Sequence, residues 1–185
     1  MRRFDQPAQP VDPYPSAETE IAGFRYDSAL VLVRAKDAVK LRTGEDADYI
    51  VGRDYLCSWR PPEGDWRQLR VPAGLVTDLA SVPAPFRGVV GRVGPWLEAA
   101  IVHDYLYIAW QDVPGRGPQP ADKRFADRIM LAAMREAQVS AWRMWTIYGA
   151  VTLFGGATFE RPNADRYVDL DDLDLSGQMA ETVPR

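Results

Sequence analysis

The pattern of hydrophobic and polar positions divides the chain into strands followed by helices. Three runs that are rich in β-branched and aromatic residues predict strands over residues 28–35, 48–59 and 66–71. Gly52 interrupts the second run, where we expect a bulge. These short segments come before every predicted helix, and that order is typical of an α+β domain. The sequence therefore predicts a small antiparallel sheet over residues 28–71.

Apolar residues spaced three and four positions apart predict three helices in the second half of the chain. They cover residues 96–110, 121–138 and 141–154. Pro95 stands where the first helix begins, and proline suits the first turn of a helix. A segment rich in glycine and proline, residues 113–120, separates the first two helices. We expect a three-helix bundle in which the first and second helices pack antiparallel.

The two ends of the chain differ from its middle. Residues 1–20 are rich in proline and have little apolar periodicity, which indicates an extended, flexible arm. Residues 161–185 are acidic, with aspartates set between leucines. Such a tail is either a solvated segment or a short segment that docks on a partner. The prediction is one α+β domain over residues 21–160, between an N-terminal arm and an acidic C-terminal tail.

Composition excludes several classes of protein. The chain has 185 residues, 46% of them hydrophobic, which suits one domain with a real core. Its formal net charge of −4 gives no basic excess, so we expect no nucleic-acid partner. Cys57 is the only cysteine, which excludes an intrachain disulfide and a cysteine-based zinc site. We expect no signal peptide, because no apolar run follows Arg2 and Arg3, and no transmembrane segment.

The single histidine of the chain, His103, is followed directly by Asp104. Both residues border the apolar face of the first predicted helix. On the second predicted helix, Asp127 shares a stripe with the apolar residues Met130 and Met134. A carboxylate on a core stripe needs a polar partner, because a buried unpaired charge is very costly. His103 is the obvious candidate, since the two stripes would meet when the helices pack.

An imidazole oriented by a carboxylate is the usual form of a general base. Tyr107 lies one turn after His103, so we predict a catalytic set of His103, Asp127 and Tyr107. The alternative is structural: a core histidine and a core tyrosine that share hydrogen bonds with a buried aspartate. The sequence leaves both interpretations open.

Two further aspartates are candidate metal ligands. Asp104 cannot reach the same imidazole face as Asp127 and could hold a cation. Asp78 lies in a turn-like segment, where it either caps the turn or supplies a second metal-coordinating oxygen. Carboxylate oxygens favour a hard cation such as calcium. Zinc is less suited, because the chain offers one histidine and one cysteine.

Several short motifs in one order give the chain a family resemblance. Residues 74–83, 103–107, 126–128 and 154–155 (GLVTDLASVP, HDYLY, ADR and FG) resemble the domain-of-unknown-function family DUF1353. The resemblance covers most of residues 66–156. It implies a phage or prophage setting and no particular reaction. It therefore implies a cytoplasmic or virion-associated protein whose arm or tail contacts other phage proteins.

A second, local resemblance concerns chemistry. His103, Asp104 and Tyr107 on one helix, with Asp127 on the next, are similar to the two-helix site of phospholipase A2 enzymes. The resemblance implies that His103 activates water, Asp104 binds calcium, and Asp127 and Tyr107 steady the histidine. The chain departs from those enzymes because it lacks their paired cysteines and a clear glycine-rich calcium loop.

Two function classes remain open after other chemistries are removed. A phosphohydrolase with several metal-binding histidines is excluded by the single histidine, and no Gly-x-Ser-x-Gly, Walker or dinucleotide motif occurs. The first class is a hydrolase, with metal assistance, that acts on an ester, amide or phosphodiester. The second is a non-enzymatic virion-associated or assembly module in which the His103 set is a structural network.

Overall fold

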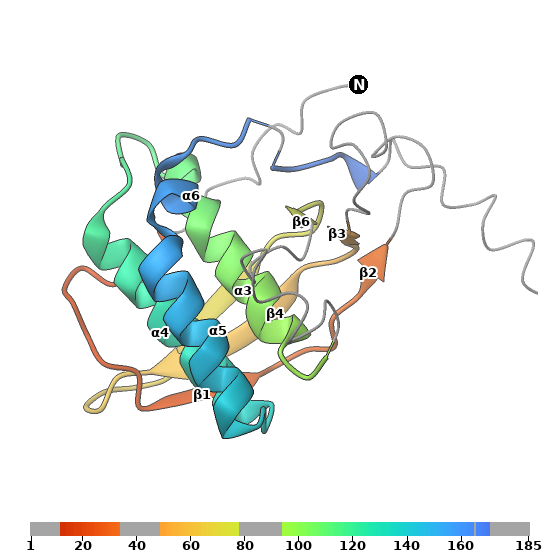
Figure 1. Ribbon diagram of the computed structural model, residues 1–185. Coiled ribbons are helices and arrows are strands. Elements are labelled where there is room, and N and C mark those ends of the chain that lie inside the picture. Colours follow the sequence, from red (N-terminus) through yellow and green to blue (C-terminus); the bar gives the residue numbers. More distant parts are fainter. Residues whose placement is uncertain (1–11, 34–48, 78–93, 165, 171–185) are drawn as a thin grey trace, which may run out of the picture.

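The computed structural model confirms an α+β fold, with strands before helices (Figure 1). It describes residues 12–33, 49–77, 94–164 and 166–170. Within them, the strands form two antiparallel three-stranded sheets where the sequence predicted one. The first sheet has the order β1-β4-β5 and the second has the order β2-β3-β6. Their strands are β1 (Gly23–Tyr26), β2 (Leu32–Val33), β3 (Tyr49–Val51), β4 (Tyr55–Arg60), β5 (Arg67–Val71) and β6 (Val76–Thr77).

The second predicted strand, residues 48–59, is two strands that belong to different sheets. β3 ends at Val51, and the chain re-enters a strand at Tyr55, now in the first sheet. Gly52 is therefore not a bulge within one strand. Its N–H donates to the Val31 carbonyl at 2.8 Å, and a Cβ at this position would lie 3.0 Å from the side chains of Val31 and Val33. Glycine allows this close approach where the chain leaves one sheet for the other.

The first predicted strand, residues 28–35, is shorter in the structure. Among the described residues of that range, only Leu32 and Val33 form a strand. Ser28 lies outside any strand, and its hydroxyl accepts a hydrogen bond from the Leu56 N–H at 2.9 Å. β1 and β6 were not predicted, because segments of two to four residues are too short to show a period-two pattern. The third prediction is confirmed by β5.

All three predicted helices are confirmed. They are α3 (Leu97–Ile108), α4 (Pro120–Glu136) and α5 (Ala141–Phe154). A 3₁₀ turn, η1 (Ala109–Asp112), extends α3, and a short helix, α6 (Gly156–Glu160), follows α5. In the described part of the chain, no helix has the length and apolarity needed to cross a membrane.

The main core lies between the helices and the first sheet (Figure 1). Alternate residues of β4, namely Tyr55, Cys57 and Trp59, are buried, and the Trp59 ring packs edge-on against Phe125 of α4 at 5.0 Å. Cys57 is a small core residue, as predicted, and burial raises the pKa of its thiol to about 12. The helices contribute the fully buried residues Ile101, Leu106, Ile129, Met130, Met134 and Ile147.

Residues 12–20, which fall in the predicted N-terminal arm, contact α3 and α4. The buried Tyr14 hydroxyl donates to the Leu106 carbonyl and accepts from the Trp110 N–H at 3.1 Å. Glu18 pairs with Arg124 and Arg128 of α4, each at 3.0 Å. Residues 1–11 and 171–185, which make up the rest of the predicted arm and most of the predicted tail, lie outside the described residues.

Tyr14→Phe should lower the free energy of unfolding by about 1–3 kcal/mol, because it leaves the Leu106 carbonyl and the Trp110 N–H without their buried partner. Urea unfolding followed by circular dichroism measures the change. Tyr148→Phe is the matched control, since no hydrogen bond of its hydroxyl occurs among the described residues. Equal stability of the two variants would show that the Tyr14 hydroxyl does not anchor this segment.

Candidate functional site

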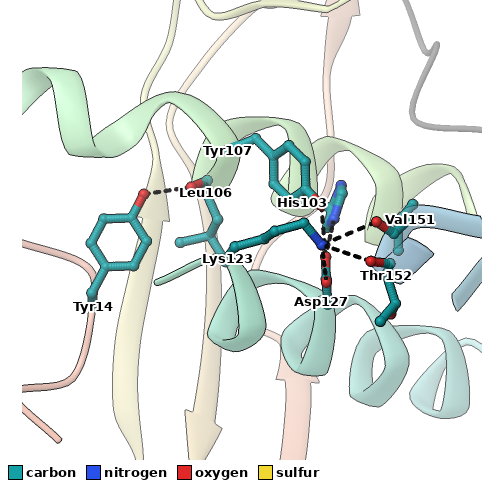
Figure 2. Close-up of polar contacts among 8 residues, drawn as sticks. All are labelled: Tyr14, His103, Leu106, Tyr107, Lys123, Asp127, Val151 and Thr152. Atoms are coloured by element: carbon teal, nitrogen blue, oxygen red, sulfur yellow. Dashed lines mark hydrogen bonds and ion pairs between the residues drawn. The ribbon is translucent and has the colours of Figure 1, made fainter. Parts of the chain in front are cut away.

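His103 and Tyr107 of α3 meet Lys123 and Asp127 of α4 in one buried cluster (Figure 2). One oxygen of Asp127, Oδ1, lies 3.0 Å from His103 Nε2 and accepts the Tyr107 hydroxyl at 2.8 Å. Lys123 donates to the other oxygen, Oδ2, at 2.8 Å. The structure thus brings together all three residues that the sequence predicted as catalytic.

Helix periodicity explains why these four side chains face one another. His103 and Tyr107 are four positions apart on α3, and Lys123 and Asp127 are four positions apart on α4, so each pair lies on one helix face. Lys123 lies over the Tyr107 ring, at 5.9 Å from its centroid, while Asp127 contacts His103 one turn further along α4. The contacts therefore run in opposite chain directions, and α3 and α4 pack antiparallel as predicted.

Lys123 is a member of the site that the sequence analysis missed. Its ammonium group also donates to the carbonyls of Val151 and Thr152, at 3.1 and 3.3 Å, near the C-terminal end of α5 (Figure 2). A cation is favoured there, because the last carbonyls of a helix carry partial negative charge. The four-residue spacing between Lys123 and Asp127 was the available signal for an ion pair.

Gly155, directly after α5, lies against the same cluster. A Cβ at this position would lie 2.4 Å from the Tyr107 hydroxyl and 2.5 Å from the Val151 carbonyl oxygen. Both separations are shorter than van der Waals contact, so a larger residue would displace one of these groups. Gly155 therefore sets the space in which the Tyr107 hydroxyl reaches Asp127.

Burial and charge fix the protonation of the carboxylate. The side chains of His103 and Asp127 are only 2% and 3% exposed. Burial alone would raise the pKa of Asp127, but the hydrogen bonds and charges of His103 and Lys123 outweigh burial and hold that pKa below its usual value. Burial, together with the charge of Asp127, raises the pKa of Tyr107. At neutral pH, Asp127 is therefore an anion and the Tyr107 phenol stays protonated and donates to it.

The hydrogen bond to Asp127 also assigns the tautomer of His103. An ionised carboxylate only accepts hydrogen bonds, so in the neutral form of the imidazole the proton is on Nε2 and the lone pair is on Nδ1. His103 Nδ1 is buried and has no hydrogen-bond partner among the residues that the structure describes. Gln111 Nε2 and Arg143 Nε are also buried and unpaired, but His103 Nδ1 is the one that belongs to this cluster. A buried polar atom without a partner requires an explanation, and a catalytic role is one of them.

Asp104, the first predicted metal ligand, contacts the second sheet. Asp104 accepts a hydrogen bond from the Thr77 hydroxyl of β6 at 2.5 Å, which ties α3 to the second sheet. Asp78 lies outside the described residues. Within the described ranges, no three His, Cys, Asp or Glu side chains gather as metal ligands. Calcium also binds backbone carbonyls and water, so the calcium site stays a prediction.

Comparison with known families identifies the chain's relatives. The model of the family described as "Protein of unknown function (DUF1353)" matches residues 51–151, more than half of the chain. The chain belongs to the DUF1353 family. The match runs from β3 into α5 and includes His103, Tyr107, Lys123 and Asp127, so the cluster lies inside the family's domain. No curated protein and no solved structure matches the chain.

Asp127→Asn should destabilise the protein at neutral pH by about 3–5 kcal/mol, because it leaves Lys123 without its carboxylate in a buried cluster. It should also change the response to acid. The pKa of Asp127 is lower in the folded protein than in the unfolded chain, so its contribution is present above about pH 4 and is lost as the pH falls through the folded value.

Urea unfolding between pH 7 and pH 2.5 tests this linkage. The wild-type protein should lose more stability than the Asp127→Asn variant in the window below about pH 4. Asp54→Asn, which alters a carboxylate that is 46% exposed, is the matched control and should follow the wild type. If the free energy of unfolding depended on pH in the same way for the wild type and for Asp127→Asn, Asp127 would not be an ionised, stabilising residue.

Proposed function

We propose that this DUF1353 protein is a hydrolase in which His103 is the general base and Asp127 orients it. The observation that carries the proposal is the state of the imidazole: Nε2 is held by Asp127, while Nδ1 is buried with no partner in the described part of the chain. The local pattern is similar to that of phospholipase A2 enzymes, which is a second support. The substrate class is an ester, amide or phosphodiester.

In the proposed reaction, Nδ1 of His103 takes a proton from a water molecule as the water oxygen attacks the substrate. The imidazole becomes an imidazolium, and the Asp127 carboxylate stabilises its positive charge through the Nε2–H bond. Tyr107 and Lys123 hold the carboxylate in place by donating to its two oxygens. The imidazolium then returns the proton to the leaving group as the scissile bond breaks, which restores the neutral base.

Calcium is a separate part of the proposal, with Asp104 and Asp78 as the ligands. No step above depends on it. We also propose the setting that the family resemblance implies, a cytoplasmic or virion-associated phage protein that contacts other phage proteins through its terminal segments.

A second candidate is favoured by burial. His103 is only 2% exposed, and each oxygen of Asp127 is already engaged by described groups. On that alternative, the cluster is a structural network that locks α3, α4 and α5 together in a non-enzymatic assembly module.

His103→Gln separates the two candidates. If His103 is the general base, this variant lacks it, and the rate of hydrolysis should fall by roughly a hundredfold to ten-thousandfold. The free energy of unfolding should change by only about 1–2 kcal/mol. Activity of the wild type should also fall on the acid side, because protonation of Nδ1 removes the lone pair. The measurements are hydrolysis of lipid, peptidoglycan and phosphodiester substrates and the melting temperature. Wild type without hydrolysis of any substrate, together with a much lower melting temperature for His103→Gln, would make the cluster structural.

Calcium is tested by thermal shift. If Asp104 is a ligand, calcium chloride should raise the melting temperature of the wild type, since a ligand of the native state stabilises it by mass action. Asp104→Asn should abolish the rise, and Asp54→Asn should retain it. An unchanged wild-type melting temperature at millimolar calcium would remove calcium from the proposal.

A further inference from the structure

A groove of about 450 Å³ lies along β5, away from the His103 cluster. Its lining includes the strand from Arg67 to Arg70, residues 12–15 and Tyr105 of α3. Tyr105 is two positions from both His103 and Tyr107, a rotation of about 200° around the helix, so the groove and the cluster lie on opposite sides of α3. The proposed hydrolase does not use this groove.

β5 presents an open edge to the groove. The strand order β1-β4-β5 makes β5 an edge strand. The Leu56 carbonyl of β4 accepts a hydrogen bond from the Asp27 N–H at 2.9 Å, so the backbone groups of Leu56 point toward the β1 side of β4. Bonding alternates along an antiparallel ladder, so Cys57 and Trp59 bond to Leu69 and Arg67 on the other side. The N–H and C=O groups of Gln68 and Arg70 therefore point away from β4, and the described residues supply no backbone partner for them.

Two carboxylates line the groove, and each is paired with an arginine. Asp112 accepts two hydrogen bonds from Arg166, at 2.7 and 2.9 Å, and one from the Tyr167 hydroxyl at 2.7 Å. Asp12 pairs with Arg116. Arg116 also donates two hydrogen bonds to Asp122, at 2.7 and 2.8 Å, so this one cation is shared between Asp12 and a carboxylate outside the groove lining. Asp112 is therefore compensated by its own arginine, and Asp12 only in part.

The arginines of β5 keep their positive charge available. Arg67 has no carboxylate partner among the described residues, and its guanidinium lies over the Trp59 ring at 5.2 Å. Arg70 is 3.4 Å from Asp54, and both side chains are 46% exposed, so water screens that pair. Arg67 and Arg70 are three positions apart and so lie on opposite faces of β5. The groove thus has a cation on each face of β5, and the nearly buried rings of Trp59 and Tyr105 form part of its lining.

We infer that this groove binds an extended acidic segment of another protein, which adds to the first sheet as a strand beside β5. The main chain of the segment would bond to Gln68 and Arg70, and two carboxylates three residues apart would reach Arg67 and Arg70. Main-chain bonds give affinity in this mode of recognition, and side-chain pockets give specificity.

The test uses the full chain and a fluorescein-labelled peptide, TVDVLDT, whose two aspartates are three residues apart. Fluorescence polarisation should show saturable binding that weakens as salt rises. The variant Arg67→Gln with Arg70→Gln should weaken binding by about tenfold or more, the scale of lost charge-assisted hydrogen bonds. Arg161→Gln, which changes an exposed arginine that does not line the groove, is the matched control and should bind as the wild type does.

Two control peptides separate strand addition from simple charge attraction. TVNVLNT, which lacks the carboxylates, should bind at least about tenfold more weakly. TVDVLDT methylated on its backbone nitrogens keeps the charge but loses the main-chain donors, and it should also fail to bind. Equal binding of the methylated peptide, or no loss in the double arginine variant, would overturn the inference.

A further variant tests whether the chain's own acidic segment occupies the groove. A full-length variant with Asp171→Asn, Asp172→Asn and Asp174→Asn should bind TVDVLDT as the wild type does. Binding in that variant alone would identify the chain's own segment as the occupant and overturn the inference of a separate partner. No binding in either protein would overturn it too, and would leave Arg67 and Arg70 as charges that discourage edge-to-edge association.

Discussion

The buried carboxylate of Asp127 is the constraint on which the helical half of the molecule depends. An anion that is 3% exposed is tolerated only when its oxygens are paired, and the partners come from two helices. His103 and Tyr107 place α3 against α4, and Lys123 continues the network to α5. The same bonds that make the charge tolerable also fix the rotation of α3 about its axis. That rotation decides that Tyr105 faces the groove along β5 while His103 faces Asp127.

The arrangement has opposite consequences for chemistry and for stability. A network in which almost every polar atom is paired is rigid, which is what a precisely oriented base requires. The exception is His103 Nδ1, which has no hydrogen-bond partner in the described part of the chain. That difference within one imidazole ring is the reason that the base is proposed ahead of the purely structural role.

The helices and the core of the site could be predicted from sequence because both follow from local spacing. The 3.6-residue period places His103 with Tyr107, and a buried carboxylate at Asp127 requires a partner whatever the details of packing. The two sheets were harder to predict from the sequence. A run such as residues 48–59 looks like one strand, and only the tertiary contact of Gly52 with Val31 and Val33 shows that the chain changes sheets there. Asp104 was predicted as a ligand from its neighbour in sequence, yet its described hydrogen bond is to Thr77, a partner fixed by long-range packing.

Gly155 limits the cluster on one side because it has no side chain. The residue has no functional group and belongs to neither helix that carries the histidine or the aspartate, yet the Tyr107 hydroxyl and the Val151 carbonyl occupy the volume that its missing side chain leaves. Even a methyl group there would press on a donor to Asp127 and on an acceptor from Lys123 at the same time. Steric exclusion at Gly155 therefore limits the polar network, although this residue has no side chain with which to make a hydrogen bond.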